Sequence, residues 1–209
     1  SPATGAGSVL DSVNGLHGTP IGGPVYTSVT GPGGPIGLQF DGLNDSILMP
    51  DYPLLAITSS ITVEAIVRIN GIAPTGDYNQ VVFRGDSRGG LDPYFLAIRD
   101  SGHLQFSVGA PNQTSANAIS PAPLPFGRTV HIAGSLDDST GLLAVYVNGV
   151  QVASLSTQIR PFATLSPAHS PGVSIGSIQS GGQRFFGVIS EVRISNAALT
   201  PIEFLPIPC

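Results

Sequence analysis

The polar residues best suited to bind a ligand gather around one loop of the sequence. Two arginines and two aspartates lie within nine residues, and a tyrosine lies near each end of this stretch. Charged groups of this kind can fix the orientation of a polar ligand, and tyrosine rings can stack on sugars. A solvated loop is the plainer interpretation of the same charges. The predicted ligand-binding residues are Tyr78, Arg84, Asp86, Arg88, Asp92 and Tyr94.

Signatures of catalysis are missing from the sequence. There is no GxSxG nucleophile elbow and no HExxH pattern. Glycan hydrolysis needs two carboxyl groups about 5–9 Å apart across a cleft. Glu64 stands alone among apolar residues, and His131 lies within an apolar run that is typical of a buried strand. We therefore predict that the protein is not an enzyme and that His131 is a hydrogen-bonded core residue.

The composition describes a globular chain with few charges. Its 209 residues include 8 arginines, no lysine and 13 acidic residues, so the net charge is −5. Without a basic patch, binding to nucleic acid is not expected, and no apolar run is long enough to insert into a membrane. The sole cysteine, Cys209, could form a disulfide only with another chain.

The elements that must position these residues read as strands. Asn148-Gly149 between alternating apolar segments is typical of a type I′ hairpin, and residues 128–153 fit three antiparallel strands. Many short strands without intervening helices predict an all-β, two-sheet antiparallel sandwich. We expect one domain over residues 1–209, in which residues 1–35 form a Gly/Pro-rich segment of short strands and loops.

Three further stretches are predicted outside the main strands. The Pro-rich residues 110–126 are predicted to form a long loop. Residues 50–57 are predicted to hold one helical turn. A short helix is expected to begin at Thr200-Pro201, because threonine is a good N-cap residue and proline suits the first helical position.

Six motifs occur along the chain in the order found in a known superfamily. They are LDSVNGLHGT at 10–19, LQFDGLNDSI at 38–47, SITVEAIV at 60–67, TVHIAG at 129–134, LAVYVNG at 143–149 and FGVISEVRISNAALT at 186–200. Together they resemble the bacterial laminin-G-like members of the concanavalin A-like lectin/glucanase superfamily. The resemblance covers nearly the whole chain and implies a jelly-roll sandwich of two large antiparallel sheets.

The same resemblance implies a structural calcium ion near the edge where the chain ends meet. Calcium prefers carboxylate and carbonyl oxygens. The chain departs from the family at two places, because it has no tryptophan and because Ser190 replaces the usual aspartate. The first departure removes the usual stacking platform for sugars, and the second bears on the calcium site. The residues that the resemblance implies as calcium ligands are Asp11, Asp41, Asn44, Asp45 and Glu191.

Two functions follow as expectations. The first is a non-catalytic extracellular module for binding or adhesion, which recognises a glycan or a protein. The alternative is a structural subunit of an extracellular filament, fibre or surface layer, which assembles with copies of itself through edge strands and chain termini. In either case we expect the protein to be secreted or displayed at the cell surface.

Overall fold

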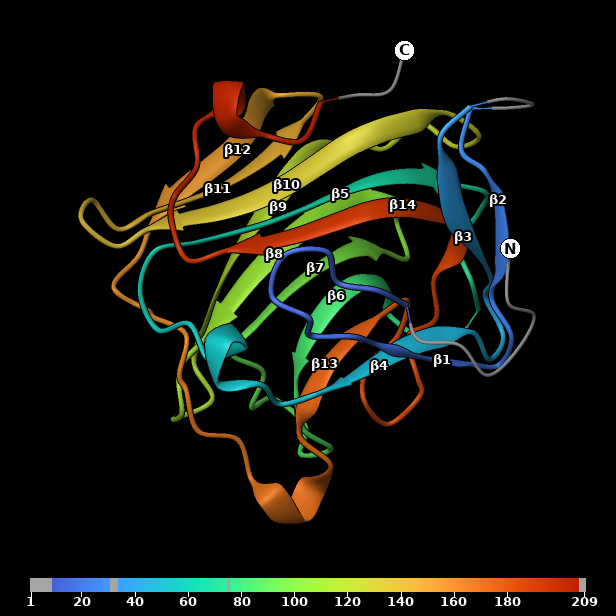
Figure 1. Ribbon diagram of the computed structural model, residues 1–209. Helices are drawn as coiled ribbons and strands as arrows, with labels where there is room; N and C mark the ends of the chain where they lie inside the picture. The colour runs from blue at the N-terminus through green and yellow to red at the C-terminus, as the bar shows by residue number, and fades with distance from the viewer. Residues whose placement is uncertain (1–8, 31–33, 75, 207–209) are drawn as a thin grey trace.

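Two antiparallel seven-stranded sheets pack face to face in the computed structural model, which describes residues 9–30, 34–74 and 76–206 (Figure 1). The predicted all-β sandwich is therefore confirmed. In spatial order, the first sheet contains β1 (Thr19–Ile21), β4 (Ser46–Pro50), β13 (Gly172–Ile175), β6 (Tyr78–Gly85), β7 (Tyr94–Arg99), β8 (His103–Gly109) and β9 (Ser115–Pro123). The second contains β12 (Val150–Ser156), β11 (Leu142–Val147), β10 (Thr129–Asp137), β5 (Ile61–Ile69), β14 (Phe186–Ser195), β3 (Ile36–Asp41) and β2 (Val25–Ser28).

The core between the sheets follows the period of two that strands impose on their side chains. Along β7, Tyr94, Leu96 and Ile98 are fully buried between the sheets. On β5, Val63 and Val67 point inward in the same way. Phe95 and Glu64 therefore project from the outer faces of their sheets.

The predicted hairpin at Asn148-Gly149 is confirmed. It joins β11 to β12, and both residues have positive φ, 51° for Asn148 and 75° for Gly149. This backbone conformation suits the type I′ turn, and it explains why asparagine and glycine occur here.

The helical elements among the described residues are short 3₁₀ turns. They are η1 (Pro53–Leu55), η2 (Pro167–His169) and η3 (Pro201–Glu203). The predicted helical start at Thr200 is present as a capping box, in which the Thr200 hydroxyl and the Glu203 carboxylate satisfy backbone donors reciprocally. The turn predicted within residues 50–57 corresponds to η1.

The prediction of a loop over residues 110–126 is wrong for its central part. Residues 115–123 form β9, which pairs with β8 at the edge of the first sheet. Its alternation is carried by the small inward residues Ala116, Ala118 and Ser120. Alternation of small residues with polar ones gives a weak hydrophobic pattern, so the strand reads as a loop in the sequence.

A bulge in β6 decides which residues of that strand face outward. Gln80 pairs with Ala97 and Val82 pairs with Leu96, so Val81 is an extra residue. The insertion reverses the alternation along the rest of the strand. Phe83 consequently shares the outer face with Phe95, and Arg84 points toward the interior with Tyr94.

Candidate binding face

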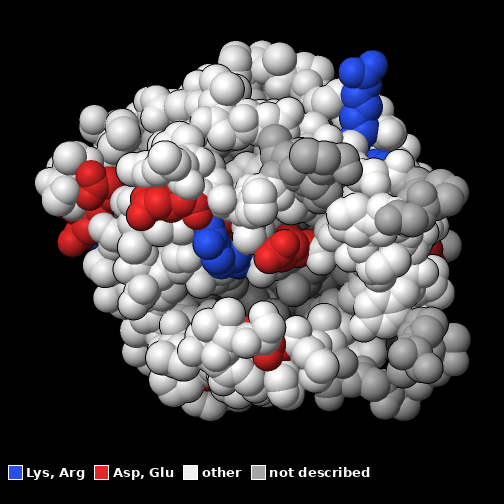
Figure 2. Space-filling view, turned by 45° about the horizontal axis from the view of Figure 1, so that its top comes forward, with Lys and Arg blue, Asp and Glu red and all other residues white. Residues whose placement is uncertain are grey.

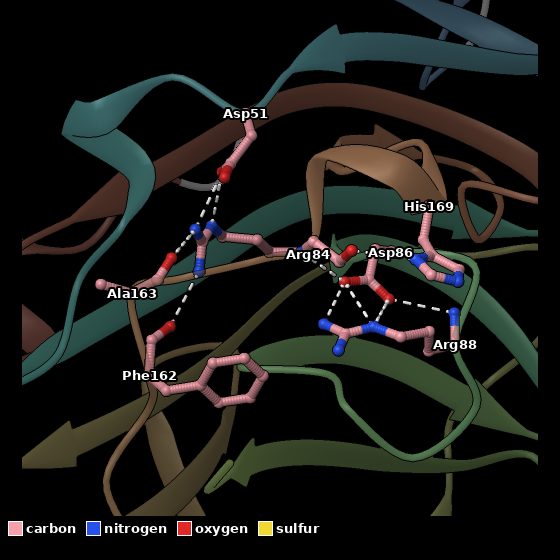
Figure 3. Close-up of polar contacts among 8 residues, drawn as sticks. Asp51, Arg84, Asp86, Arg88, Phe162, Ala163 and His169 are labelled. Atoms are coloured by element: carbon pink, nitrogen blue, oxygen red, sulfur yellow. Dashed lines mark hydrogen bonds and ion pairs between the residues drawn. The ribbon is translucent and has the colours of Figure 1, made fainter.

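Arg84 is a structural residue at the end of the sandwich. Its side chain is fully buried, and it reaches the Asp51 carboxylate, with Nη2 2.8 Å from Oδ1 (Figure 3). Its Nη1 and Nη2 also donate to the backbone carbonyls of Phe162 and Ala163. Tyr94 is likewise buried and donates to the Leu55 carbonyl. The structure therefore corrects the sequence interpretation, since neither side chain is open to a ligand.

Asp86 and Arg88 satisfy each other within the β6–β7 loop. The guanidinium of Arg88 donates to both carboxylate oxygens of Asp86, and the Ser166 N–H donates to Oδ2 at 2.9 Å. Burial opposes ionisation, but these donors outweigh it and hold the pKa of Asp86 at about 2. The pair therefore fastens two loops together (Figure 3) and leaves Asp86 shielded from a ligand.

Asp92, unlike Arg84 and Tyr94, lies on the outer face of the first sheet. A Cβ atom added at Gly85 would lie 2.9 Å from Oδ1 of Asp92 and 2.5 Å from the Phe83 ring. Glycine at this position therefore makes room for both side chains. Within the described part of the chain, the Asp92 carboxylate has no hydrogen-bond partner. Burial raises its pKa to about 7, and the nearby Asp86 carboxylate adds to the shift.

Two glutamines on the same face carry unsatisfied polar atoms. Gln80 is 1 % exposed and donates through Nε2 to Oε1 of Gln183 at 2.7 Å, while its own Oε1 has no partner. Gln179, from the β13–β14 loop, has a buried Nε2 without a partner, and a Cβ at Gly172 would lie 2.9 Å from that atom. Buried polar atoms without partners are rare in folded proteins, and these two are among the few that the described residues hold.

Aromatic and amide side chains continue this face across the sheet. Tyr78 and Phe95 meet edge to face with ring centroids 5.5 Å apart, and the Arg99 guanidinium lies 5.7 Å from the centroid of Tyr78. Arg99 donates to Oε1 of Gln105, and Gln105 donates in turn to Oδ1 of Asn117. We define the binding face as Tyr78, Gln80, Phe83, Asp92, Phe95, Arg99, Gln105, Asn117 and Gln179.

Sequence reasoning found two members of the binding face, Tyr78 and Asp92, and missed the rest. One signal for this face is present in the sequence, because Gln80 is a polar residue next to the apolar run of β6. Gln105 and Asn117 likewise occupy positions that alternate with buried core residues along β8 and β9. Which alternate positions face outward depends on strand pairing and on the β6 bulge, so the sequence pattern alone does not assemble them.

The residues expected to bind calcium do not come together as one donor set. Asp41 accepts hydrogen bonds from the N–H groups of Leu43 and Asn44 within the β3–β4 turn. Arg184, which comes from the β13–β14 loop, donates to the carbonyls of Asn44 and Asp45 in this turn. A guanidinium therefore already lies where a cation would lie. No three His, Cys, Asp or Glu side chains are arranged to hold a metal ion in residues 9–30, 34–74 and 76–206.

The remaining two expected ligands lie elsewhere. The Asp11 carboxylate accepts hydrogen bonds from the N–H groups of Val13, Asn14 and Leu16. Glu191 is exposed on β14, and both side chains line a groove between the sheets. Within the described residues, this arrangement does not fit a calcium ion at the expected site.

The outer face of the second sheet carries a buried polar cluster that sequence reasoning anticipated in part. His131 is 1 % exposed, and its Nε2 lies 2.8 Å from Oε2 of Glu64. Arg193 Nε donates to Oε1 of Glu64 at 2.6 Å, and the Leu205 N–H donates to Oε2 at 2.8 Å. The predicted core histidine is confirmed, and the cluster anchors the segment that follows β14.

Several solved structures share this fold. Domain 4 of AbnA, an extracellular arabinanase from Geobacillus stearothermophilus solved with arabinotriose, is 21 % identical, covers 92 % of this chain and 89 % of its own, and has a TM-score of 0.68. A Ruminococcus gnavus sialidase CBM40 bound to α2,3-sialyllactose is 14 % identical, covers 86 % and 93 %, and has a TM-score of 0.59. At these identities the likeness shows the fold alone.

A third similar structure comes from Bacteroides ovatus, and its description as a carbohydrate-binding protein is provisional. It is 28 % identical over 70 % of this chain with a TM-score of 0.54, and this chain spans 40 % of its length. A comparison with curated proteins gives no match. No helix among the described residues has the length and apolar character needed to cross a membrane.

The clearest finding comes from the comparison with protein families. The model for laminin G domains of the third type, described as the concanavalin A-like lectin/glucanases superfamily, matches residues 41–203. The match spans both sheets, from the end of β3 to η3. The chain is therefore a member of the laminin-G branch of the concanavalin A-like lectin/glucanases superfamily.

Proposed function

We propose that this protein is a secreted, non-catalytic glycan-binding module and that the binding face of the first sheet holds the sugar. The observation that carries the proposal is the pair of buried amide atoms without partners, Gln80 Oε1 and Gln179 Nε2. Leaving such atoms unpaired is costly, and side chains that turn outward to a ligand with both donors and acceptors would remove the cost. Sugar hydroxyl groups are donors and acceptors at once.

The other members of the face suit the same ligand. The free carboxylate of Asp92 can accept hydrogen bonds from two neighbouring hydroxyl groups. The partly exposed ring of Phe95, held by Tyr78, offers an apolar surface to the C–H face of a sugar ring. Three of the similar structures are described in terms of carbohydrate: one solved with arabinotriose, one bound to sialyllactose and one provisionally carbohydrate-binding. They support the ligand class, and the extracellular arabinanase supports secretion.

The carboxyl groups at this face argue for binding without hydrolysis. Asp92 has Asp86 as a neighbour, but the Asp86 side chain is fully buried and paired with Arg88. A glycosidase needs two carboxyl groups that both reach the scissile bond. Among the described residues that make up the binding face, only Asp92 carries a carboxyl group.

A glycan array followed by calorimetric titration tests the proposal. Arabinotriose and α2,3-sialyllactose are the first probes. We expect at least one glycan to bind, Gln179→Ala to weaken binding by about fivefold through the loss of one hydrogen bond, and Phe95→Ala to weaken it further. Gln158→Ala, an exposed glutamine outside the face, is the matched control and leaves affinity unchanged. Absence of binding across the array, or equal affinity in all three variants, contradicts the proposal.

Adhesion and self-assembly remain separate predictions. Cys209, through which two chains could be joined, lies outside the described residues. Sedimentation velocity over a range of protein concentrations, with and without reductant, tests assembly. Concentration-dependent growth of the particles supports the filament alternative, and a single monomeric species contradicts it.

A further inference from the structure

A groove opens into the sandwich between β14 of the second sheet and the strands β4 and β13 of the first sheet. Its volume is about 660 Å³, which lies within the range of natural ligand sites. Core side chains such as Phe40, Ile47 and Ile175 form its floor. Exposed apolar residues surround the mouth, among them Leu10, Val13 and Leu54 at 74 %, 81 % and 63 % exposure.

One wall of this groove is an unpaired strand edge. β3 pairs with β14 only as far as the Leu38–Ile189 pair, and Ser190 Oγ then donates to the Ile36 carbonyl. From residue 191 to residue 195, β14 pairs with β5 on its other side alone. No backbone hydrogen bond to the free side of this stretch occurs in the described ranges. Every second residue of an unpaired edge presents its N–H and C=O groups for pairing with another strand.

The mouth of the groove is acidic. Asp11 lies on the wall formed by the N-terminal segment and Glu191 on the wall formed by β14. Backbone donors from Val13, Leu16 and Asn14 lower the pKa of Asp11, with burial opposing them, so its carboxylate is charged. Arg193 also lines the groove, but its guanidinium already serves Glu64 and the Glu203 carbonyl. Figure 2 shows acidic side chains on both sides of the hollow and a basic side chain beside one of them.

We propose that the groove binds an extended peptide segment of a partner protein, which alternates apolar and basic residues and adds to β14 as a strand. The free backbone edge supplies main-chain hydrogen bonds, the apolar floor takes every second side chain, and the acidic rim takes the basic residues between them. Because side chains of a strand alternate between two sides, one peptide satisfies all three features at once.

The charge of the chain disfavours a second copy of itself as the occupant. The protein carries a net charge of −5, has no lysine and has only 8 arginines. An acidic rim repels such a chain, whereas it attracts a basic peptide at low ionic strength.

The test measures binding of a fluorescein-labelled seven-residue peptide that alternates lysine and valine, by fluorescence anisotropy at low salt. An alternating glutamate–valine peptide is the charge control. Two further lysine–valine peptides carry backbone N-methyl groups on the first or on the second set of alternate residues. Strand addition uses the N–H groups of one set only, so one methylated peptide loses binding and the other retains it.

Variants locate the binding to this groove. Glu191→Lys is expected to weaken the lysine–valine peptide about fivefold at low salt, and added salt should reduce the difference. Asp100→Lys changes the charge of an exposed aspartate in the β7–β8 turn, away from the groove, and leaves affinity unchanged. Both sites are exposed, so neither variant threatens folding.

Three results overturn the proposal. They are equal binding of the lysine and glutamate peptides, equal loss with both N-methylated peptides, and no difference between Glu191→Lys and Asp100→Lys. If sedimentation instead shows dimers that Glu191→Lys abolishes, the groove belongs to a second copy and the peptide assignment is wrong. Glycan binding is measured at the other sheet, so the outcome leaves the proposed function unaffected.

Discussion

Glu64 and His131 lie against each other on neighbouring strands β5 and β10, with Oε2 of Glu64 2.8 Å from Nε2 of His131. Neither side chain is more than 1 % exposed. The same carboxylate accepts hydrogen bonds from Arg193 and from the backbone N–H of Leu205. A single buried carboxylate thus joins β5, β10, β14 and the segment after η3.

Replacing this carboxylate should release that segment. We expect Glu64→Ala to lower the free energy of unfolding by about 3–5 kcal/mol, because it strands Arg193 and His131 without their partner. Burial raises the pKa of Glu64, but its donors outweigh burial and lower it overall. The stability that the cluster contributes is therefore present at neutral pH and is lost as pH falls through the folded-state pKa. Urea titrations at pH 7 and pH 4 measure both effects, with the exposed Glu191→Ala as control. Equal stability of the two variants at pH 7 would contradict the assignment.

The contribution of Asp92 to stability should be more favourable in mild acid than in alkali. Its folded-state pKa of about 7 lies above the unfolded value, so the folded state keeps a proton that the unfolded state releases. The stability that Asp92 contributes therefore falls as pH rises from about 4 to about 7. Asp92→Asn should add about 1–2 kcal/mol at pH 8, after allowance for solvent screening, and nothing at pH 4. Thermal melts across this range, with Asp100→Asn as the exposed control, check the sign. A pH-independent effect would contradict it.

Arg84 should be indispensable for folding rather than for binding. Arg84→Met removes donors to Asp51 and to the carbonyls of Phe162 and Ala163. We expect a loss of about 3 kcal/mol or more, because a partly buried carboxylate and two carbonyls lose their partner. Arg128→Met, at an exposed position, should stay within about 0.5 kcal/mol of the parent. Denaturant titration distinguishes the two, and similar stabilities would refute the role of Arg84.

Gly134 in β10 should tolerate no side chain. An added Cβ would lie 2.1 Å from the Phe106 ring in the facing sheet, closer than atoms can approach. Gly134→Ala is therefore expected to cost about 1–3 kcal/mol through displacement of that ring. At Gly89 an added Cβ meets nothing within 4 Å, so Gly89→Ala is the matched control and should be nearly neutral. If both variants melt alike, the packing between the sheets is looser than described.

Calcium binding can be tested by thermal melting. A bound ion at a hundredfold excess over its Kd would add about 2.7 kcal/mol to the free energy of unfolding. Thermal melts in excess calcium and in EGTA check this. The hydrogen bonds from Arg184 to the carbonyls of Asn44 and Asp45 lead us to expect identical curves. A higher melting temperature in calcium that Asp41→Asn abolishes would instead restore the predicted site.

The elements of the fold were more predictable than the orientation of their side chains. Asn148-Gly149 carries its turn type in its own residues, and the Thr200–Glu203 capping box is equally local. The inward direction of Arg84, in contrast, results from one extra residue at Val81. A bulge leaves no mark on composition and reverses every later position of the strand. Likewise, the side chain of Gln179 in the β13–β14 loop has its place because Gly172 of β13 carries no side chain there.

The position of β14 between β5 and β3 has a consequence for the time course of folding. The Leu205 N–H meets Glu64 across 141 residues of chain, and β14 pairs with β5 over a comparable span. Contacts between such distant segments close large loops and form slowly. The hairpin β11–β12 can form early, but the second sheet stays divided until β14 arrives. During synthesis, most of the chain must therefore emerge before β5, the central strand of this sheet, gains β14 as its second neighbour.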